Sequence, residues 1–182
     1  MSARIAPAEP PFVPAVAERL ERIMPPGMPP LTLFTTLARN QRVFERLMAG
    51  GLLDPGSLSL RQRELMIDRT CARCGCGYEW GVHVALFADR VGLGPAEIEA
   101  LATAAPEDGP WEAAERALLA LADALHDGAA IPDALWAALS EYYSNEQLIE
   151  LIALAGYYHL IAFMANGLRL PAERFAPPLP PA

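Results

Sequence analysis

The residues that could carry chemistry in this 182-residue chain are concentrated between positions 64 and 83. Cys76, Glu79 and His83 are spaced three and four residues apart, so a helix through this segment places their side chains on one face. An imidazole one helical turn from a carboxylate can exchange a proton with it, and the same imidazole can activate a nearby thiol. The spacing therefore predicts either proton transfer or thiol chemistry.

A second candidate, Glu64, lies upstream on a stripe that is otherwise apolar. Leu60, Glu64, Ile67 and Cys71 follow helical spacing and would form one continuous face. A carboxylate on such a face needs a partner or a function, because burying a charge alone is costly. We therefore expect the helix of Glu64 to pack against the helix of His83.

All three cysteines lie between positions 71 and 76, which is more typical of a cytoplasmic chain than of a secreted disulfide scaffold. Cys71, Cys74 and Cys76 are the redox candidates, because a strained disulfide between Cys74 and Cys76 would be labile. The three thiols together with His83 would supply the four ligands of a zinc site. Gly75 and Gly77 predict a hinge, however, and two of the thiols lie on opposite sides of it, so we expect no metal. We expect no other cofactor either.

Helical periodicity predicts the elements that position these residues. Helices are expected over 13–24, 31–50 with a break near Asn40, 59–73 and 78–91. Three more should begin near prolines at positions 95, 110 and 132, and a long apolar helix should run from 144 to about 170.

The expected fold class is all-α, because no segment shows the alternation typical of a half-buried strand. Positions 59–62 and 144–147 both have the Ser-x-x-Gln pattern of a capping box at a helix start. We divide the chain into a helical lead-in over 1–57 that packs on the core, a helical core over 58–170 and a proline-rich tail over 171–182.

Composition and charge exclude several classes of protein. The chain has no lysine, which excludes Schiff-base chemistry on a lysine of its own, and its formal net charge is −8. Twelve acidic residues lie within 92–150 against Arg116 alone, so we expect neither nucleic acid nor a membrane surface as a partner. Residues 151–168 are uncharged but include Tyr158, His159 and Asn166, which favours a buried central helix over a membrane span. The first 14 residues lack a signal-peptide pattern, and we expect a cytoplasmic protein.

Two segments resemble the carboxymuconolactone decarboxylase superfamily, which also contains the alkylhydroperoxidase D-like proteins. They are Arg-Glu-Leu at 63–65 and Gly-Tyr-Glu-Trp-Gly-Val-His at 77–83. The resemblance is strongest over 58–105, and Gly-Tyr-Tyr at 156–158 is similar to longer members. It implies an alkylhydroperoxidase D-like helical bundle that assembles into a homo-oligomer.

The resemblance also implies roles for individual residues. In the peroxidase branch, an acid precedes a Cys-x-x-Cys motif whose second cysteine lies four residues before a histidine. Counting back from His83 places that peroxide-attacking position at Glu79 and the first cysteine at Cys76, while Glu64 matches the upstream acid. The implied catalytic candidates are therefore Glu64, Cys76, Glu79 and His83, without the peroxidatic thiol.

Three functions remain open. The first is cofactor-free acid–base catalysis, a decarboxylation or isomerisation of a small carboxylated or lactone-type substrate, with His83 as proton shuttle, Glu64 orienting it and Glu79 as a second acid or base. The expected substrate-binding residues are aromatic or imidazole side chains near this face and on the last helix: Tyr78, Trp80, Tyr158 and His159. The second is a thiol peroxidase or disulfide reductase using Cys74 and Cys76 with His83, and the third is a non-catalytic binding or assembly protein. Glu79 places acid–base catalysis first, because a carboxylate can move a proton but cannot attack a peroxide.

The apolar content predicts assembly with further copies of the chain. Apolar residues make up 53% of the sequence, above the usual ~45–50%. The excess lies in helices over 111–125 and 151–168, and a domain of this size has limited interior volume to bury both. We expect a homo-oligomer whose interface uses helical surface rather than the proline-rich ends.

Overall fold

The computed structural model describes residues 3–50, 52 and 54–181, and every regular element within these ranges is helical, which confirms the all-α prediction. The elements are α1 (Pro14–Ile23), α2 (Thr32–Leu37), α3 (Gln41–Ala49), α4 (Leu60–Arg73), α5 (Gly77–Phe87), the short 3₁₀ turn η1 (Asp89–Val91), α6 (Pro95–Thr103), α7 (Ala113–Gly128), α8 (Asp133–Ser140) and α9 (Asn145–Leu168).

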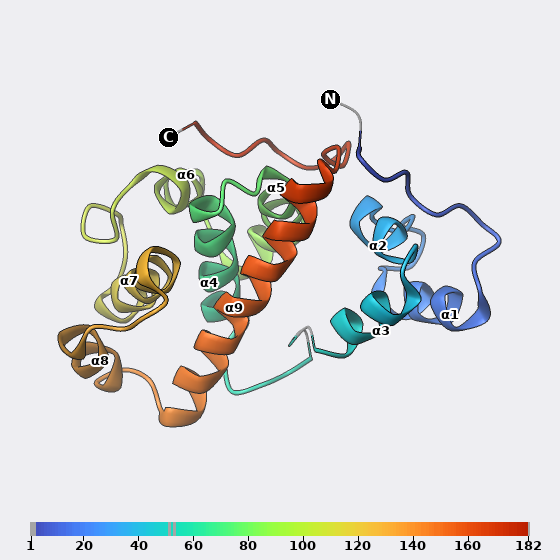
Figure 1. Cartoon of the computed structure of the whole chain (residues 1–182). Helices are drawn as coiled ribbons and strands as arrows, with labels where there is room; N and C mark the ends of the chain where they lie inside the picture. Colours follow the sequence, from blue (N-terminus) through green and yellow to red (C-terminus); the bar gives the residue numbers. More distant parts are fainter. Residues whose placement is uncertain (1–2, 51, 53, 182) are drawn as a thin grey trace.

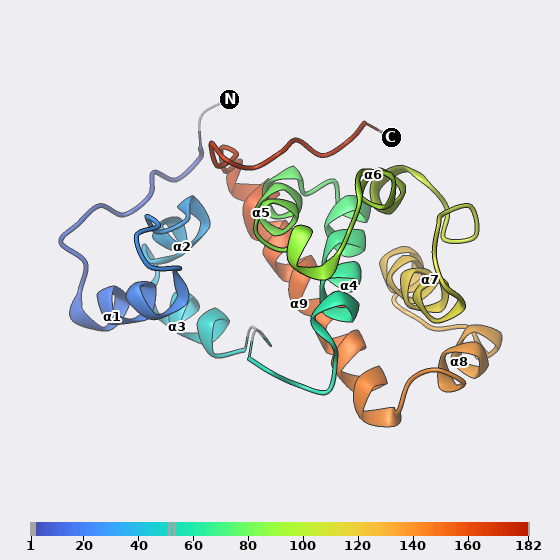
Figure 2. The same cartoon turned by 180° about the vertical axis from the view of Figure 1, so that it is seen from behind.

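Helix α4 lies at the centre of the fold and contacts α5, α6, α7 and α9 (Figures 1 and 2). The predicted capping box forms at its start, where Ser59 and Gln62 satisfy each other's backbone N–H groups. At its other end Gly75 has a φ of +58°, in the left-handed region that favours glycine. This turn lets α5 fold back along α4, so residues near the start of α4 face residues near the end of α5.

Helix α9 is the longest element and also begins at a predicted capping box, between Ser144 and Gln147. It is long and apolar enough to cross a membrane, but 44% of its most apolar stretch is buried within the protein. That side packs against α4, α5 and α7. The opposite side exposes Ile149 and Phe163, which are 69% and 68% accessible.

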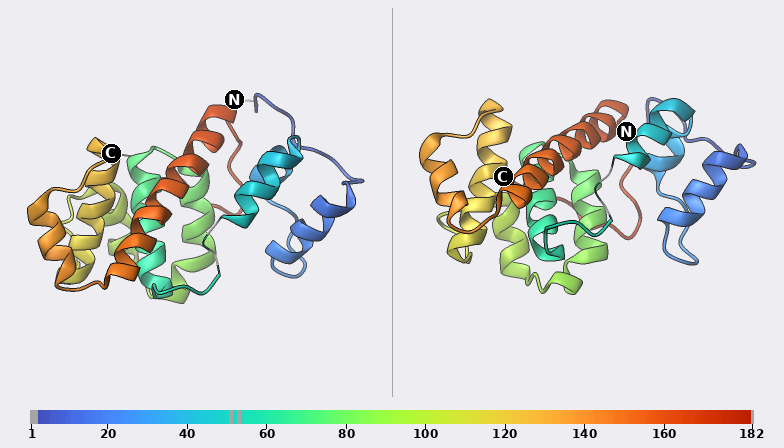
Figure 3. Two further views of the ribbon diagram at one scale, coloured as in Figure 1. Left: turned by 60° about the horizontal axis from the view of Figure 1, so that its bottom comes forward. Right: turned by 90° about the horizontal axis from the view of Figure 1, so that it is seen from below.

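The helices of the first 50 residues pack together at one end of the molecule, and α7 with α8 lies at the other (Figures 1 and 3). The hydroxyl of Tyr78 connects the N-terminal helices to the core. It accepts a hydrogen bond from the Leu33 backbone at 2.9 Å and donates one to Glu173 at 2.5 Å. The C-terminal tail crosses α5 at Gly81, where a Cβ atom would lie 2.5 Å from the Pro177 carbonyl oxygen.

Two predicted helix starts differ from the structure. Pro95 is the first residue of α6, as expected. Pro110 instead precedes α7, because the capping box between Glu112 and Glu115 starts that helix later. Pro132 is the N-cap of α8 rather than its first residue. The break near Asn40 is present, and the Asn40 side chain caps α3. The division of the chain into lead-in, core and tail stays a prediction.

Candidate active site

A chain of hydrogen bonds connects one side chain from each of α4, α5 and α9. His83 Nδ1 lies 2.7 Å from Glu64 Oε2, and His83 Nε2 lies 3.0 Å from the Tyr158 hydroxyl. All three side chains are buried. A proton on Nδ1 is shared with the carboxylate, which leaves Nε2 for the phenol or for a ligand. The expected contact between Glu64 and His83 is therefore present.

Glu79 lies one helical turn before His83 on the same face of α5. Its Oε2 atom is 3.6 Å from His83 Nε2, whereas its buried Oε1 atom has no hydrogen-bond partner among the described residues. Leaving a buried carboxylate oxygen unpaired costs free energy. Glu79 Oε1 is thus an acceptor that a bound molecule can satisfy.

Burial and neighbouring charge shift the pKa values of the site together. Burial raises the pKa of Glu79, partly opposed by His83. Burial alone would lower the pKa of His83, but the hydrogen bond and charge of Glu64, with the charges of Glu79 and Asp68, more than offset it and the net shift is upward. Burial also raises the pKa of Asp68, one turn after Glu64, to about 8. The pKa values of all three groups are therefore shifted upward, which favours their protonated forms.

These groups border a small cavity of about 120 Å³. Its polar lining consists of Glu79, His83, Tyr157 and Tyr158, and the other lining side chains are apolar. Seven of the fifteen lining residues come from positions 23–48 in the N-terminal segment. Neither a cysteine nor an arginine is among the lining residues. The arrangement favours proton transfer on an uncharged, largely apolar molecule.

Two expected substrate contacts lie outside this cavity. Trp80 is fully buried in the core and does not line it. Tyr78 does not line it either, because its hydroxyl is held by Leu33 and Glu173 on another side of α5. Both residues are adjacent in sequence to Glu79, and consecutive residues on a helix point about 100° apart. Of the expected aromatic contacts, Tyr158 alone lines the cavity.

The cysteines are all free, and their pKa values are unfavourable for thiolate chemistry. Cys76, the N-cap of α5, is buried, and burial raises its pKa to about 12. Burial also raises the pKa of Cys71, and that of the half-buried Cys74, where Arg73 partly opposes the shift. Since the thiolate is the nucleophilic form, burial makes Cys71 and Cys76 in particular poor nucleophiles.

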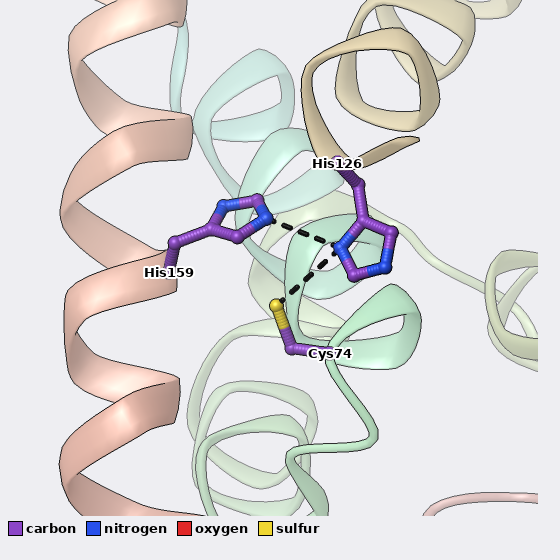
Figure 4. A group of neighbouring side chains, drawn as sticks. All are labelled: Cys74, His126 and His159. Carbon is purple, nitrogen blue, oxygen red and sulfur yellow. Dashed lines mark hydrogen bonds between the residues drawn. The ribbon is translucent and has the colours of Figure 1, made fainter. Parts of the chain in front are cut away.

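His159 belongs to a second cluster rather than to the cavity. Its Nε2 atom lies 3.1 Å from His126 Nδ1, which in turn lies 3.7 Å from Cys74 Sγ (Figure 4). Neither His126 nor Asp68 is among the site residues predicted from the sequence. Asp68 could have been found as a second acid one turn after Glu64, but His126 is 52 residues from Cys74 and no local spacing connects them.

Comparison with protein-family models finds a match to the carboxymuconolactone decarboxylase family over residues 38–123. The matched region contains Glu64, Asp68, Glu79 and His83, and it begins 20 residues before the segment 58–105 in which the sequence resemblance is strongest. A search of curated proteins finds no match.

Solved structures with the same fold cover nearly the whole chain. An uncharacterized peroxidase-related protein from Ralstonia eutropha JMP134, described as an alkylhydroperoxidase AhpD core, has a TM-score of 0.84 at 20% identity and covers 94% of this chain and 93% of its own. A peroxidase-related protein from Silicibacter sp. TM1040 has a TM-score of 0.81 at 17% identity, with 94% and 92% covered. The debrominase Bmp8, as a cysteine-to-alanine variant with 2,3,4-tribromopyrrole, has a TM-score of 0.76 at 17% identity, with 96% and 94% covered. These similarities confirm the predicted alkylhydroperoxidase D-like bundle.

Proposed function

We propose that this chain, a member of the carboxymuconolactone decarboxylase and alkylhydroperoxidase D-like superfamily, is an enzyme that relocates a proton on a small uncharged molecule without a cofactor. One observation carries the proposal. Glu79 Oε1, which has no hydrogen-bond partner among the described residues, and the His83 imidazole border the same apolar cavity, and no cysteine is among its lining residues. An isomerisation of a lactone-type substrate fits this lining best.

The carboxylated substrate that the sequence left open has less support. An anionic substrate would lie in a cavity whose lining includes Glu79 and no arginine, and the chain has no lysine. A lactone carbonyl, in contrast, is uncharged and needs one hydrogen-bond donor. The imidazolium of His83 or the phenol of Tyr158 supplies that donor.

The proposed reaction uses Glu79 as the base and His83 as the electrophile. Glu79 removes a proton from the carbon next to the carbonyl, and the electrons of that C–H bond move onto the carbonyl oxygen. The protonated His83 Nε2 stabilises the resulting enolate by a hydrogen bond, while Glu64 stabilises the imidazolium from the other side. Glu79 then returns the proton to the far carbon of the conjugated system, so that the double bond shifts and the enzyme is unchanged.

The raised pKa values support these roles. A carboxylate with a raised pKa is a stronger base than an ordinary glutamate, and a raised pKa favours the protonated form of His83. The pKa of Tyr158 is raised well above its usual value, chiefly by burial, so its hydroxyl keeps its proton and can donate beside His83.

Thiol peroxidase activity is the alternative that the peroxidase-related neighbours suggest. It has weaker support, because Cys71 and Cys76 are buried and Cys74 lies in the second cluster. A peroxide bound in the cavity would meet carboxylate, imidazole and phenol groups and no sulfur among the lining residues.

Deuterium exchange tests the proposal directly. Small unsaturated lactones are incubated with the enzyme in D₂O, and deuterium uptake next to the carbonyl is followed by NMR. We expect uptake with the wild type and with Cys76→Ser, and its loss with Glu79→Gln, which keeps the shape of the side chain and removes the base. Uptake that persists in Glu79→Gln, or peroxide consumption that depends on a cysteine, would overturn the assignment.

A further inference from the structure

A second group of ligating side chains lies where α4, α7 and α9 meet (Figure 4). Cys74 is the C-cap of α4, His126 lies in the last turn of α7, and His159 lies in the middle of α9. The thiol and one nitrogen of each ring lie within 4.8 Å of one another. The chain contains three histidines, so two of them meet one of its three cysteines here.

We propose that Cys74, His126 and His159 form a binding site for a divalent metal ion of borderline softness, with Zn²⁺ as the expected occupant. Thiolate and imidazole are the ligands that Zn²⁺ prefers in proteins. Three protein ligands leave one tetrahedral position for water, which is typical of an open zinc site. The proposal departs from the expectation of no metal, which considered these thiols with His83 and not with the other two histidines.

The distances between the ligand atoms suit a tetrahedral ion. Zn–N bonds of about 2.0–2.1 Å and a Zn–S bond of about 2.3 Å at tetrahedral angles place two nitrogens about 3.3 Å apart, and a nitrogen and sulfur about 3.6 Å apart. The structure has 3.1 Å between His126 Nδ1 and His159 Nε2, and 3.7 Å between His126 Nδ1 and Cys74 Sγ. Small side-chain adjustments therefore suffice to admit the ion.

A hydrogen bond to the backbone orients the His159 ring for metal binding. His159 Nδ1 donates to the Ala155 carbonyl at 2.8 Å, which directs Nε2 and its lone pair toward His126.

Hydrogen bonds and ion pairs also hold the backbone and the charged neighbours of the site in place. Asn166 on α9 donates to the Cys74 carbonyl at 3.0 Å, which connects the end of α4 to α9. Arg73 binds Asp127 at 2.5 Å and lies 3.5 Å from Asp123, so the nearby acids are paired with a cation. All three ligand side chains are half-buried, which leaves a route for an ion from solvent.

Cobalt binding to the untagged full-length protein tests this site without any substrate. Co²⁺ replaces Zn²⁺ in such sites and reports both its geometry and its sulfur ligand by absorption. We expect one Co²⁺ per chain, the intense visible bands of a tetrahedral ion, a thiolate-to-cobalt charge-transfer band and displacement by Zn²⁺. A spectrum without the charge-transfer band would overturn the assignment of Cys74, and no binding would overturn the site.

Variants locate the ion. In Cys74→Ser, His126→Gln and His159→Gln we expect the dissociation constant for Zn²⁺ to rise by at least about tenfold, whereas Cys76→Ser and His83→Gln should bind as the wild type does. Circular dichroism checks that each variant is folded. Zn²⁺ should also raise the thermal unfolding midpoint of the wild type but not that of His159→Gln, because an ion stabilises only the fold that binds it. Equal affinity across all variants would disprove the site, whatever the activity at Glu79 and His83 proves to be.

Discussion

The two histidine clusters both involve α4 and α9, and they differ in the charges around the rings. Tyr158 and His159 are neighbours on α9, yet the first contacts His83 and the second contacts His126. In the first cluster the imidazole is buried among carboxylates, whereas in the second the rings face each other near Arg73.

The sign of the neighbouring charge decides what each imidazole can do. Acidic neighbours overcome the effect of burial and raise the pKa of His83, which favours the protonated ring. At His126 burial, a guanidinium and a second imidazole lower the pKa against partial opposition from Asp127 and Asp123, which favours the neutral ring. One residue type thus fits proton chemistry at one end of α4 and metal chemistry at the other.

The largest expected effect concerns the proton chemistry of the first cluster. Replacing His83 with glutamine should lower the deuterium-exchange rate by on the order of 10²–10³-fold, because the hydrogen-bond donor that stabilises the enolate is lost. Cys76→Ser should keep most of the rate. If Cys76→Ser abolishes turnover while His83→Gln keeps it, the reaction depends on the thiol rather than on the imidazole.

The acidic surroundings of His83 should also reduce stability at high pH. The pKa of Asp68 rises from 3.8 to about 8 on folding, so the folded state binds more protons between these values and stability falls as the pH rises through this window. Asp68→Asn has no titrating group at this position and should not lose this stability. We therefore expect its free energy of unfolding, relative to that of the wild type, to increase by on the order of a few kcal/mol between pH 5 and pH 9. Urea denaturation at both pH values measures the difference, and a gap that does not change with pH would contradict the account.

Two glycines beside the clusters should respond to alanine in opposite directions. Gly81, between Glu79 and His83, faces the backbone of the C-terminal tail, so Gly81→Ala should destabilise the protein by roughly 1–3 kcal/mol. Gly156, on α9, faces open space, so Gly156→Ala should stabilise it by about 0.5–1 kcal/mol through helix propensity. Thermal unfolding distinguishes them, and a loss at both positions would mean that the tail contact is not the cause.

The last prediction concerns the exposed side of α9 and the number of chains in the assembly. We propose that the chain forms a homo-oligomer through this side, where Ile149 and Phe163 are more than two-thirds exposed. Such an interface would cover the helix that bears His159. Light scattering at low micromolar concentration should give the mass of two or more chains, and Phe163→Glu should lower it. A wild-type mass near 20 kDa would end this proposal.

Helical periodicity predicted the first cluster and missed the second for a physical reason. Glu64 and His83 lie on faces that a 3.6-residue repeat defines, so their contact follows from two local patterns. Trp80 and His159 directly follow Glu79 and Tyr158 in the sequence, but adjacent residues of a helix point in different directions, and neither of them lines the cavity. The meeting of Cys74 with His126 depends on how α7 packs against α4, which no local spacing encodes.

The lining of the cavity has a consequence for how this molecule can diverge. The groups that would move the proton come from α4, α5 and α9, whereas seven of the fifteen lining residues come from positions 23–48. Substitutions in that N-terminal segment reshape the walls without touching Glu79 or His83. Sequence changes in this segment can therefore alter which molecule fits while Glu64, His83 and Tyr158 keep their contacts, and relatives that bind different molecules should differ first at positions 23–48.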